Sequence, residues 1–100
     1  MASTLIHLAV AKEVGKQIER SSKEYYLGSI APDLGKIVTG EKHTSHFQKP
    51  DEETPNLDFF LVKYKDYLKN NDFVLGYYVH LLTDYFWFKY FISELKKLNI

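Results

Sequence analysis

Two polar side chains stand inside an almost wholly apolar and aromatic stretch, GYYVHLLTDYFW at residues 76–87. They are His80 and Asp84, four residues apart, so on a helix they project from the same face. Burying an ionised carboxylate without a partner costs much free energy. The pair therefore predicts either a buried His–Asp hydrogen bond or a cation that both side chains share.

Other residues of the same types are candidates for such a cation site. His7 lies in the apolar run LIHLAVA, Asp33 in GSIAPDLG, and His43 and His46 in a polar stretch. Each alone has an ordinary explanation, as a core histidine, a turn aspartate or a solvated loop histidine. Together with Asp84 and His80 they supply two carboxylates and up to four imidazoles without any cysteine, which suits zinc or another borderline divalent ion. Two carboxylates would balance the charge of the ion, and acid would release it because its ligands must be deprotonated.

The composition of the 100-residue chain limits the class of protein. With 45% hydrophobic and 16% aromatic residues, it predicts a single folded domain over residues 1–100. Thirteen basic residues balance thirteen acidic ones, so no nucleic-acid partner is expected. The absence of cysteine excludes disulfides and thiolate metal sites. The N-terminal apolar run lacks a basic leader, so we expect no signal peptide and a cytoplasmic protein.

Apolar residues at helical spacing predict an all-α fold, a compact bundle of several helices. A first helix is expected from about Leu5 to Glu19, with Ser3 or Thr4 as its cap. Residues 23–38 should form only a short element, because two glycines and a proline interrupt them. The interrupting residues are Gly28, Pro32 and Gly35. Asp33 is therefore expected in a loop or at a helix edge.

The second half of the chain predicts a long polar connection and two more helices. Residues 39–55 carry His43 and His46 and have little apolar periodicity, so they should be irregular. Thr54 followed by Pro55 predicts a helix start. The face of that helix should comprise Leu57, Phe60, Leu61, Tyr64 and Leu68.

The last predicted helix contains the His80–Asp84 pair. The sequence KNND at residues 69–72 should end the preceding helix and cap this one, which should run from about Asp72 to Lys97. Its apolar part, residues 73–92, is about as long as a bilayer-spanning helix. The histidine, aspartate and lysine inside it favour a central helix of a bundle instead.

Four segments, taken in chain order, resemble one known family: HLAVA, GSIAPD, SHF and GYYVHLLTDYFW. They are similar to the zinc-dependent phospholipase C family, an all-helical phosphodiesterase fold related to S1/P1-type nucleases, over most of residues 3–90. The His-x-x-x-Asp helix is the most specific of these segments. The resemblance implies a metal-dependent hydrolase of a phospholipid head group or a similar phosphodiester. It also allows the chain to be the N-terminal part of a larger helical fold of that kind.

The resemblance implies a role for each candidate residue. Four residues match the ligands of one zinc ion in the family: Asp33, His46, His80 and Asp84. His7 and Asp84 match ligands of a neighbouring zinc ion, so that Asp84 bridges the two. A water activated by the ions would attack phosphorus, and Asp33 would assist as the base. One or two bound zinc ions are therefore expected.

Among the departures of the chain from the family pattern, the one at the third metal site leaves its role open. The third zinc ion of the family takes further His, His and Glu ligands beyond the His-x-x-x-Asp helix, whereas no histidine follows His80 here. At most two of the three metal sites can be built, so the chain is either a fragment or a reduced relative. The alternative to an enzyme is a non-catalytic helical module with a structural metal or a buried polar network. Aromatic residues around Trp87 also suggest transient contact with a membrane surface.

Overall fold

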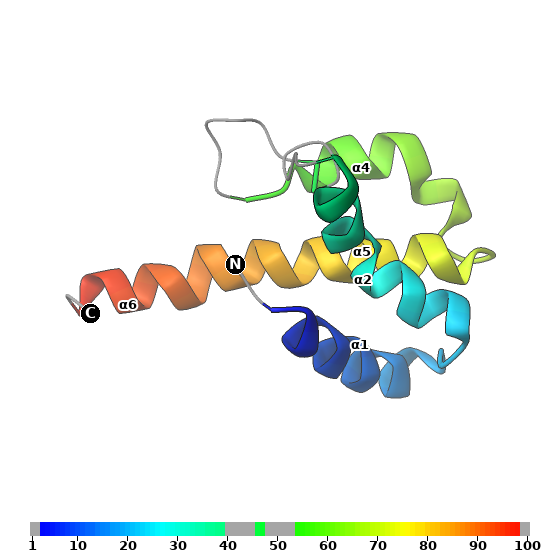
Figure 1. The fold of residues 1–100 in the computed structure, drawn as a ribbon, viewed down its shortest axis with the longest axis horizontal. Helices are drawn as coiled ribbons and strands as arrows, with labels where there is room; N and C mark the ends of the chain where they lie inside the picture. Colours follow the sequence, from blue (N-terminus) through cyan, green and yellow to red (C-terminus); the bar gives the residue numbers. More distant parts are fainter. Residues whose placement is uncertain (1–2, 40–45, 48–53, 99–100) are drawn as a thin grey trace.

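In a computed structural model the chain is built from helices, and the structure describes residues 3–39, 46–47 and 54–98. No strand occurs among these residues, and the all-α prediction is confirmed. The elements are α1 (Thr4–Ile18), α2 (Lys23–Thr39), α4 (Leu57–Tyr64), the 3₁₀ turn η1 (Lys65–Tyr67), α5 (Asp72–Phe86), the π-helical segment η2 (Trp87–Ile92) and α6 (Ser93–Lys97). Figure 1 shows α5, η2 and α6 as one long rod, with α1 and α4 on opposite sides of it and α2 crossing it.

The first helix lies where the sequence predicts it, within one residue at each end. The hydroxyl of Ser3 caps α1 by accepting a hydrogen bond from the amide of Ile6 at 3.2 Å. Glu19 ends the helix in the left-handed conformation, with φ of 60°. The amide of Arg20 then donates to the carbonyl of Gly15 at 2.9 Å, which closes the last turn.

The second helix is longer than predicted. Residues 23–38 do not form a short element that leaves Asp33 in a loop or at a helix edge; α2 is a continuous 17-residue helix with Pro32 inside it. Gly28 lies inside α2 and forms no turn. A side chain is excluded there, because a Cβ atom would overlap the backbone carbonyl oxygen of Phe73 on α5. The glycine therefore lets the backbones of α2 and α5 touch. The apolar surface that these two helices bury against each other offsets the cost of a proline inside α2, about 3 kcal/mol.

The core lies where α1 and α2 pack on α5. Its buried members include Ala11, Tyr25 and Val79. The hydroxyl of Tyr25 donates to the carbonyl oxygen of Ala11 at 2.8 Å, which ties α2 to α1. Gly76 on α5 faces the backbone of Tyr25 as closely as Gly28 faces α5. These small residues set the distance between α2 and α5, the two helices that carry most of the polar residues discussed below.

The predicted helix start at Thr54–Pro55 is two residues too early. Asn56 caps α4 by accepting a hydrogen bond from the amide of Phe59 at 3.0 Å, and Pro55 is buried ahead of the helix. Asparagine is a better N-cap than threonine, which accounts for the shift.

The final helix has the predicted extent but not a uniform geometry. Asn71 caps α5 by accepting from the amide of Val74 at 3.1 Å, in the predicted KNND segment. The α-helix then changes to a π-helix at Trp87–Ile92 before α6 begins. Among the described residues, no helix has both the length and the apolar character needed to cross a bilayer.

Candidate metal centre

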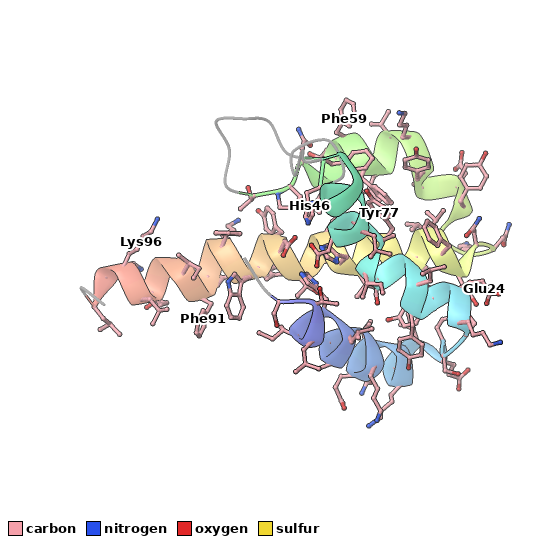
Figure 2. All side chains as sticks on the ribbon, viewed as in Figure 1. Glu24, His46, Phe59, Tyr77, Phe91 and Lys96 are labelled. Atoms are coloured by element: carbon pink, nitrogen blue, oxygen red, sulfur yellow. The ribbon has the colours of Figure 1, made fainter. Side chains whose placement is uncertain are left out.

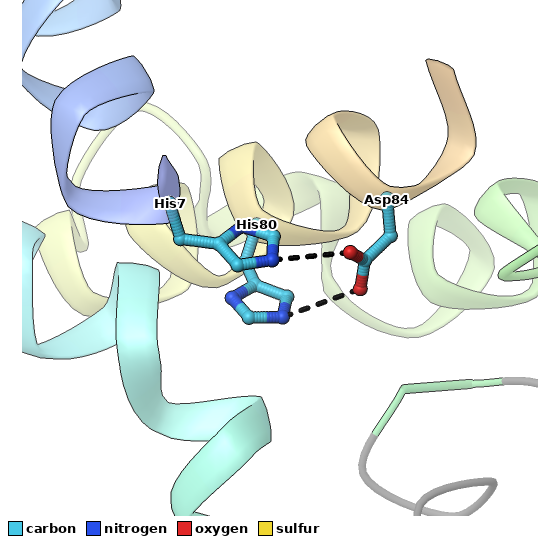
Figure 3. A group of neighbouring side chains, drawn as sticks. All are labelled: His7, His80 and Asp84. Carbon is cyan, nitrogen blue, oxygen red and sulfur yellow. Dashed lines mark ion pairs between the residues drawn. The ribbon is translucent and has the colours of Figure 1, made fainter. Parts of the chain in front are cut away.

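The five predicted ligand residues lie together between α1, α2 and α5. They are His7 of α1, Asp33 of α2, His46 of the segment between α2 and α4, and His80 and Asp84 of α5. Figure 2 shows His46 pointing from its segment toward α5, and Figure 3 shows how His7 and His80 approach Asp84. The fourth histidine, His43, lies outside the described residues.

The cluster is almost completely buried. The side chains of His7, His46 and His80 are 0% exposed, that of Asp84 is 3% exposed and that of Asp33 is 16% exposed. Burial of carboxylates and imidazoles costs free energy unless each polar atom finds a partner. The arrangement of the donor atoms therefore decides what this cluster can bind.

Four donor atoms have the mutual spacing of ligands around one ion. His46 Nε2 lies 3.1 Å from Asp33 Oδ1 and 3.2 Å from His80 Nε2. His80 Nε2 lies 3.3 Å from Asp84 Oδ2 and 3.6 Å from Asp33 Oδ1. His46 Nε2 also lies 3.6 Å from Asp84 Oδ2. Two ligand atoms bound tetrahedrally to zinc lie about 3.3 Å apart, so these separations suit a single zinc ion.

The ring of His80 is held in the orientation that metal binding needs. Its Nδ1 lies 2.6 Å from the carbonyl oxygen of Ser29. Because a carbonyl can only accept, Nδ1 carries a proton, and Nε2 of the neutral ring turns its lone pair toward the cluster. Metal-binding histidines are commonly fixed by such a hydrogen bond from their second nitrogen.

The other oxygen of Asp84 faces a different imidazole. Asp84 Oδ1 lies 3.0 Å from His7 Nε2, while Oδ2 faces His80 (Figure 3). The ring of His7 stacks on that of His80, with centroids 3.5 Å apart. Despite this proximity the atoms are not aligned for hydrogen bonding: within the described part of the chain, both nitrogens of His7 and both oxygens of Asp84 have no hydrogen-bond partner. A cation would satisfy these buried atoms, so the residues fit a metal site.

The histidines keep both carboxylates ionised. Burial raises the pKa of Asp84, but the proximity of His7 and His80 outweighs it and holds that pKa well below its usual range. Burial also raises the pKa of Asp33, but the hydrogen bond with His46 and electrostatic interactions with the three histidines outweigh burial, so the pKa of Asp33 lies below its usual value. Both groups are therefore anionic at neutral pH, the state in which a carboxylate binds a divalent ion.

Two contacts of the cluster were not predicted from the sequence. The carbonyl of Ser29, which orients His80, is a backbone group and leaves no signal in the residue types. Thr4 was predicted only as a possible helix cap, yet its hydroxyl donates to Asp33 Oδ2 at 3.3 Å. Its position one turn before His7 was the only available sign that it lies beside the cluster.

The geometry agrees with the outcome of comparison with known proteins. The family model for zinc-dependent phospholipase C matches residues 2–91, a range that contains all five clustered residues. No curated protein and no solved structure matches the chain. The chain belongs to the zinc-dependent phospholipase C family.

Proposed function

We propose that the protein is a zinc-dependent hydrolase of phosphodiesters, with a phospholipid head group or a similar phosphodiester as substrate. The observation that carries the proposal is the buried convergence of His46 and His80 nitrogens with carboxylate oxygens at the spacing of zinc ligands. Membership of the family supports zinc as the ion and a phospholipid-type substrate.

The proposal assigns the five residues to two ions. One ion takes a single atom from each of four residues: Asp33, His46, His80 and Asp84. A second ion takes His7 and the remaining oxygen of Asp84. The bridging role is supported by the way in which the two oxygens of Asp84 face His7 and His80 separately. Two carboxylates around the first ion would balance its charge of about +2, which makes Asp84 tolerable in the core.

The chemistry divides between the ions and Asp33. When bound, zinc would supply an acidified water and positive charge opposite the phosphate oxygens. Asp33 is the most exposed of the five side chains, and its Oδ2 faces Thr4, away from the contacts that Oδ1 makes with the imidazoles. Its carboxylate is ionised, so Oδ2 can accept a proton from the attacking water. A low pKa makes Asp33 a weak base, which suffices because the water is already acidified.

A second candidate function is a non-catalytic module with a structural metal. The observation in its favour is burial: four of the five side chains are at most 3% exposed, and structural zinc sites are typically closed. Under this alternative, chelation would lower the melting temperature of the protein without removing any activity.

Two measurements on protein purified without added metal test the proposal. Elemental analysis should find one or two zinc ions per chain, and a chromogenic phosphodiester should be cleaved in a reaction that chelator stops and zinc restores. His46→Ala should lose zinc and activity, whereas His43→Ala, the control from the same stretch of sequence, should have a mild effect. Zinc-loaded protein that cleaves neither model phosphodiesters nor phospholipids would favour the structural module.

A further inference from the structure

One residue beside the candidate metal centre has an unusual backbone conformation. Phe47 has φ of 52°, in the left-handed region that residues with a side chain rarely adopt. Such a conformation costs about 1–2 kcal/mol and persists only where surrounding contacts fix it. Phe47 directly follows His46, so its backbone helps to set the direction in which that imidazole points.

The contacts that fix Phe47 come from α4 and α5. Its ring packs against four other rings: Phe59 at 5.9 Å, Phe60 at 5.2 Å, Tyr64 at 6.2 Å and Tyr77 at 6.0 Å between centroids. Its carbonyl oxygen accepts a hydrogen bond from the amide of Asn56 at 2.7 Å. Aromatic pairs at these separations each add about 0.5–1.5 kcal/mol beyond burial, enough to outweigh the backbone cost.

His46 needs such an anchor more than the other four clustered residues do. Those four lie on α1, α2 and α5, where helix backbones fix their positions. His46 lies in a turn that belongs to none of the helices, yet its side chain is completely buried against Asp33 and His80. The entropy of ordering this segment must be offset by contacts nearby, and the ring of Phe47 provides them.

We propose that Phe47 is a positioning residue for the metal centre: its ring, held between α4 and α5, fixes His46 Nε2 toward Asp33 and His80. The proposal rests on the zinc site of the proposed function. Removal of a residue that orients a metal ligand typically lowers metal affinity about 10–100-fold. Phe47→Ala should therefore weaken zinc binding by about that factor, because His46 must then be ordered when the metal binds.

The same aromatic region offers a matched control. A cavity of about 180 Å³ is lined by Phe47, Phe60, Tyr64, Phe73, Val74 and Tyr77. Phe73→Ala removes a half-buried ring that lines this cavity and leaves Phe47, the residue next to His46, unchanged. It should destabilise the protein in urea but leave zinc affinity within about threefold of wild type, since no ligand depends on it. Phe47→Tyr keeps the ring and should retain wild-type affinity.

The experiment measures zinc affinity by competition with a chelating dye, and the absorption spectrum of the cobalt-substituted protein. In Phe47→Ala the cobalt spectrum should keep its wild-type form, because His46 still binds once it is ordered, whereas in His46→Ala it should change, because water replaces the imidazole. In a His46→Ala background, Phe47→Ala should have no further effect on affinity, which a merely structural role for the ring would not predict. If Phe47→Ala does not fold, Phe47→Leu replaces it.

Three results would overturn the inference. One is wild-type zinc affinity in Phe47→Ala, a second is an equal loss in Phe73→Ala, and a third is an undiminished effect in the His46→Ala background. Wild-type protein that binds no zinc at all would instead refute the proposed metal site itself, before any variant is made.

Discussion

Replacing Gly76 by alanine tests whether the close packing of α5 on α2 positions the candidate metal centre. A Cβ atom at this position would overlap the carbonyl oxygen of Tyr25 and lie 2.9 Å from the backbone nitrogen of Ser29, whereas ordinary contact begins at 3.4 Å. Both obstacles are backbone atoms of α2, so no side-chain rotation relieves them. The two helices must separate by at least about 0.5 Å at Ser29, and by more at Tyr25.

Two effects of the added methyl group oppose each other, and the clash is the larger. Alanine in a helix interior is favoured over glycine by about 1 kcal/mol. Overpacking costs about 1–3 kcal/mol or more, and contact with rigid backbone puts Gly76→Ala at the upper end. The net loss in the free energy of unfolding should be about 2 kcal/mol. The same separation lengthens the 2.6 Å hydrogen bond from His80 to the Ser29 carbonyl, so zinc affinity should fall about 10–100-fold.

The assay combines urea unfolding of the zinc-free protein with zinc competition against a chelating dye. Asn71→Ala is the control, because it removes the cap of α5 and costs about 1 kcal/mol without adding bulk between α2 and α5. Its zinc affinity should stay near that of wild type. The reasoning is refuted if Gly76→Ala is as stable as wild type and binds zinc equally well.

Other predictions concern the carboxylate, the response to acid and alkali, and metal removal. Asp84→Asn keeps the shape of the side chain but should sharply lower zinc content by elemental analysis; zinc content equal to that of wild type would show that Asp84 is not a metal ligand. Acid should release zinc, because the ligands of a divalent ion must be deprotonated. The lowered pKa values of Asp33 and Asp84 should keep both carboxylates ionised in mild acid, and dialysis at stepped pH measures the zinc retained. Burial raises the pKa of Tyr77 to about 12. Above about pH 10 the unfolded chain therefore loses this proton before the folded protein does, and the free energy of unfolding should fall as pH rises. Urea unfolding should show a weaker fall with pH in Tyr77→Phe. Chelation should lower the melting temperature, since zinc at about 1,000 times its dissociation constant stabilises by about 4 kcal/mol; an unchanged transition would argue against bound metal.

The sequence was most informative where local chemistry decides the structure. Ser3 and the KNND segment cap their helices as predicted, because a cap depends on residues only three positions away. The sequence was least informative about α2, since glycine and proline suggest a turn unless the facing helix is known. Gly28 permits contact with a helix that lies more than forty residues further along the chain, and no local pattern shows this.

The residues of the candidate site were predictable from the sequence, but their geometry was not. Residue types and the resemblance to a family selected His7, Asp33, His46, His80 and Asp84 as a set, and the structure brings all five together. Their distances, and the hydrogen bond between His80 and the backbone of Ser29, depend on the packing of α2 against α5 and were not predictable. Binding of zinc by these residues remains a prediction.

The most direct test of the metal centre is X-ray diffraction at the zinc absorption edge from crystals grown without chelator. We predict an anomalous peak about 2.0–2.1 Å from the Nε2 atoms of His46 and His80, between the carboxylates of Asp33 and Asp84. Crystals soaked in zinc that show no peak among these atoms would contradict the account.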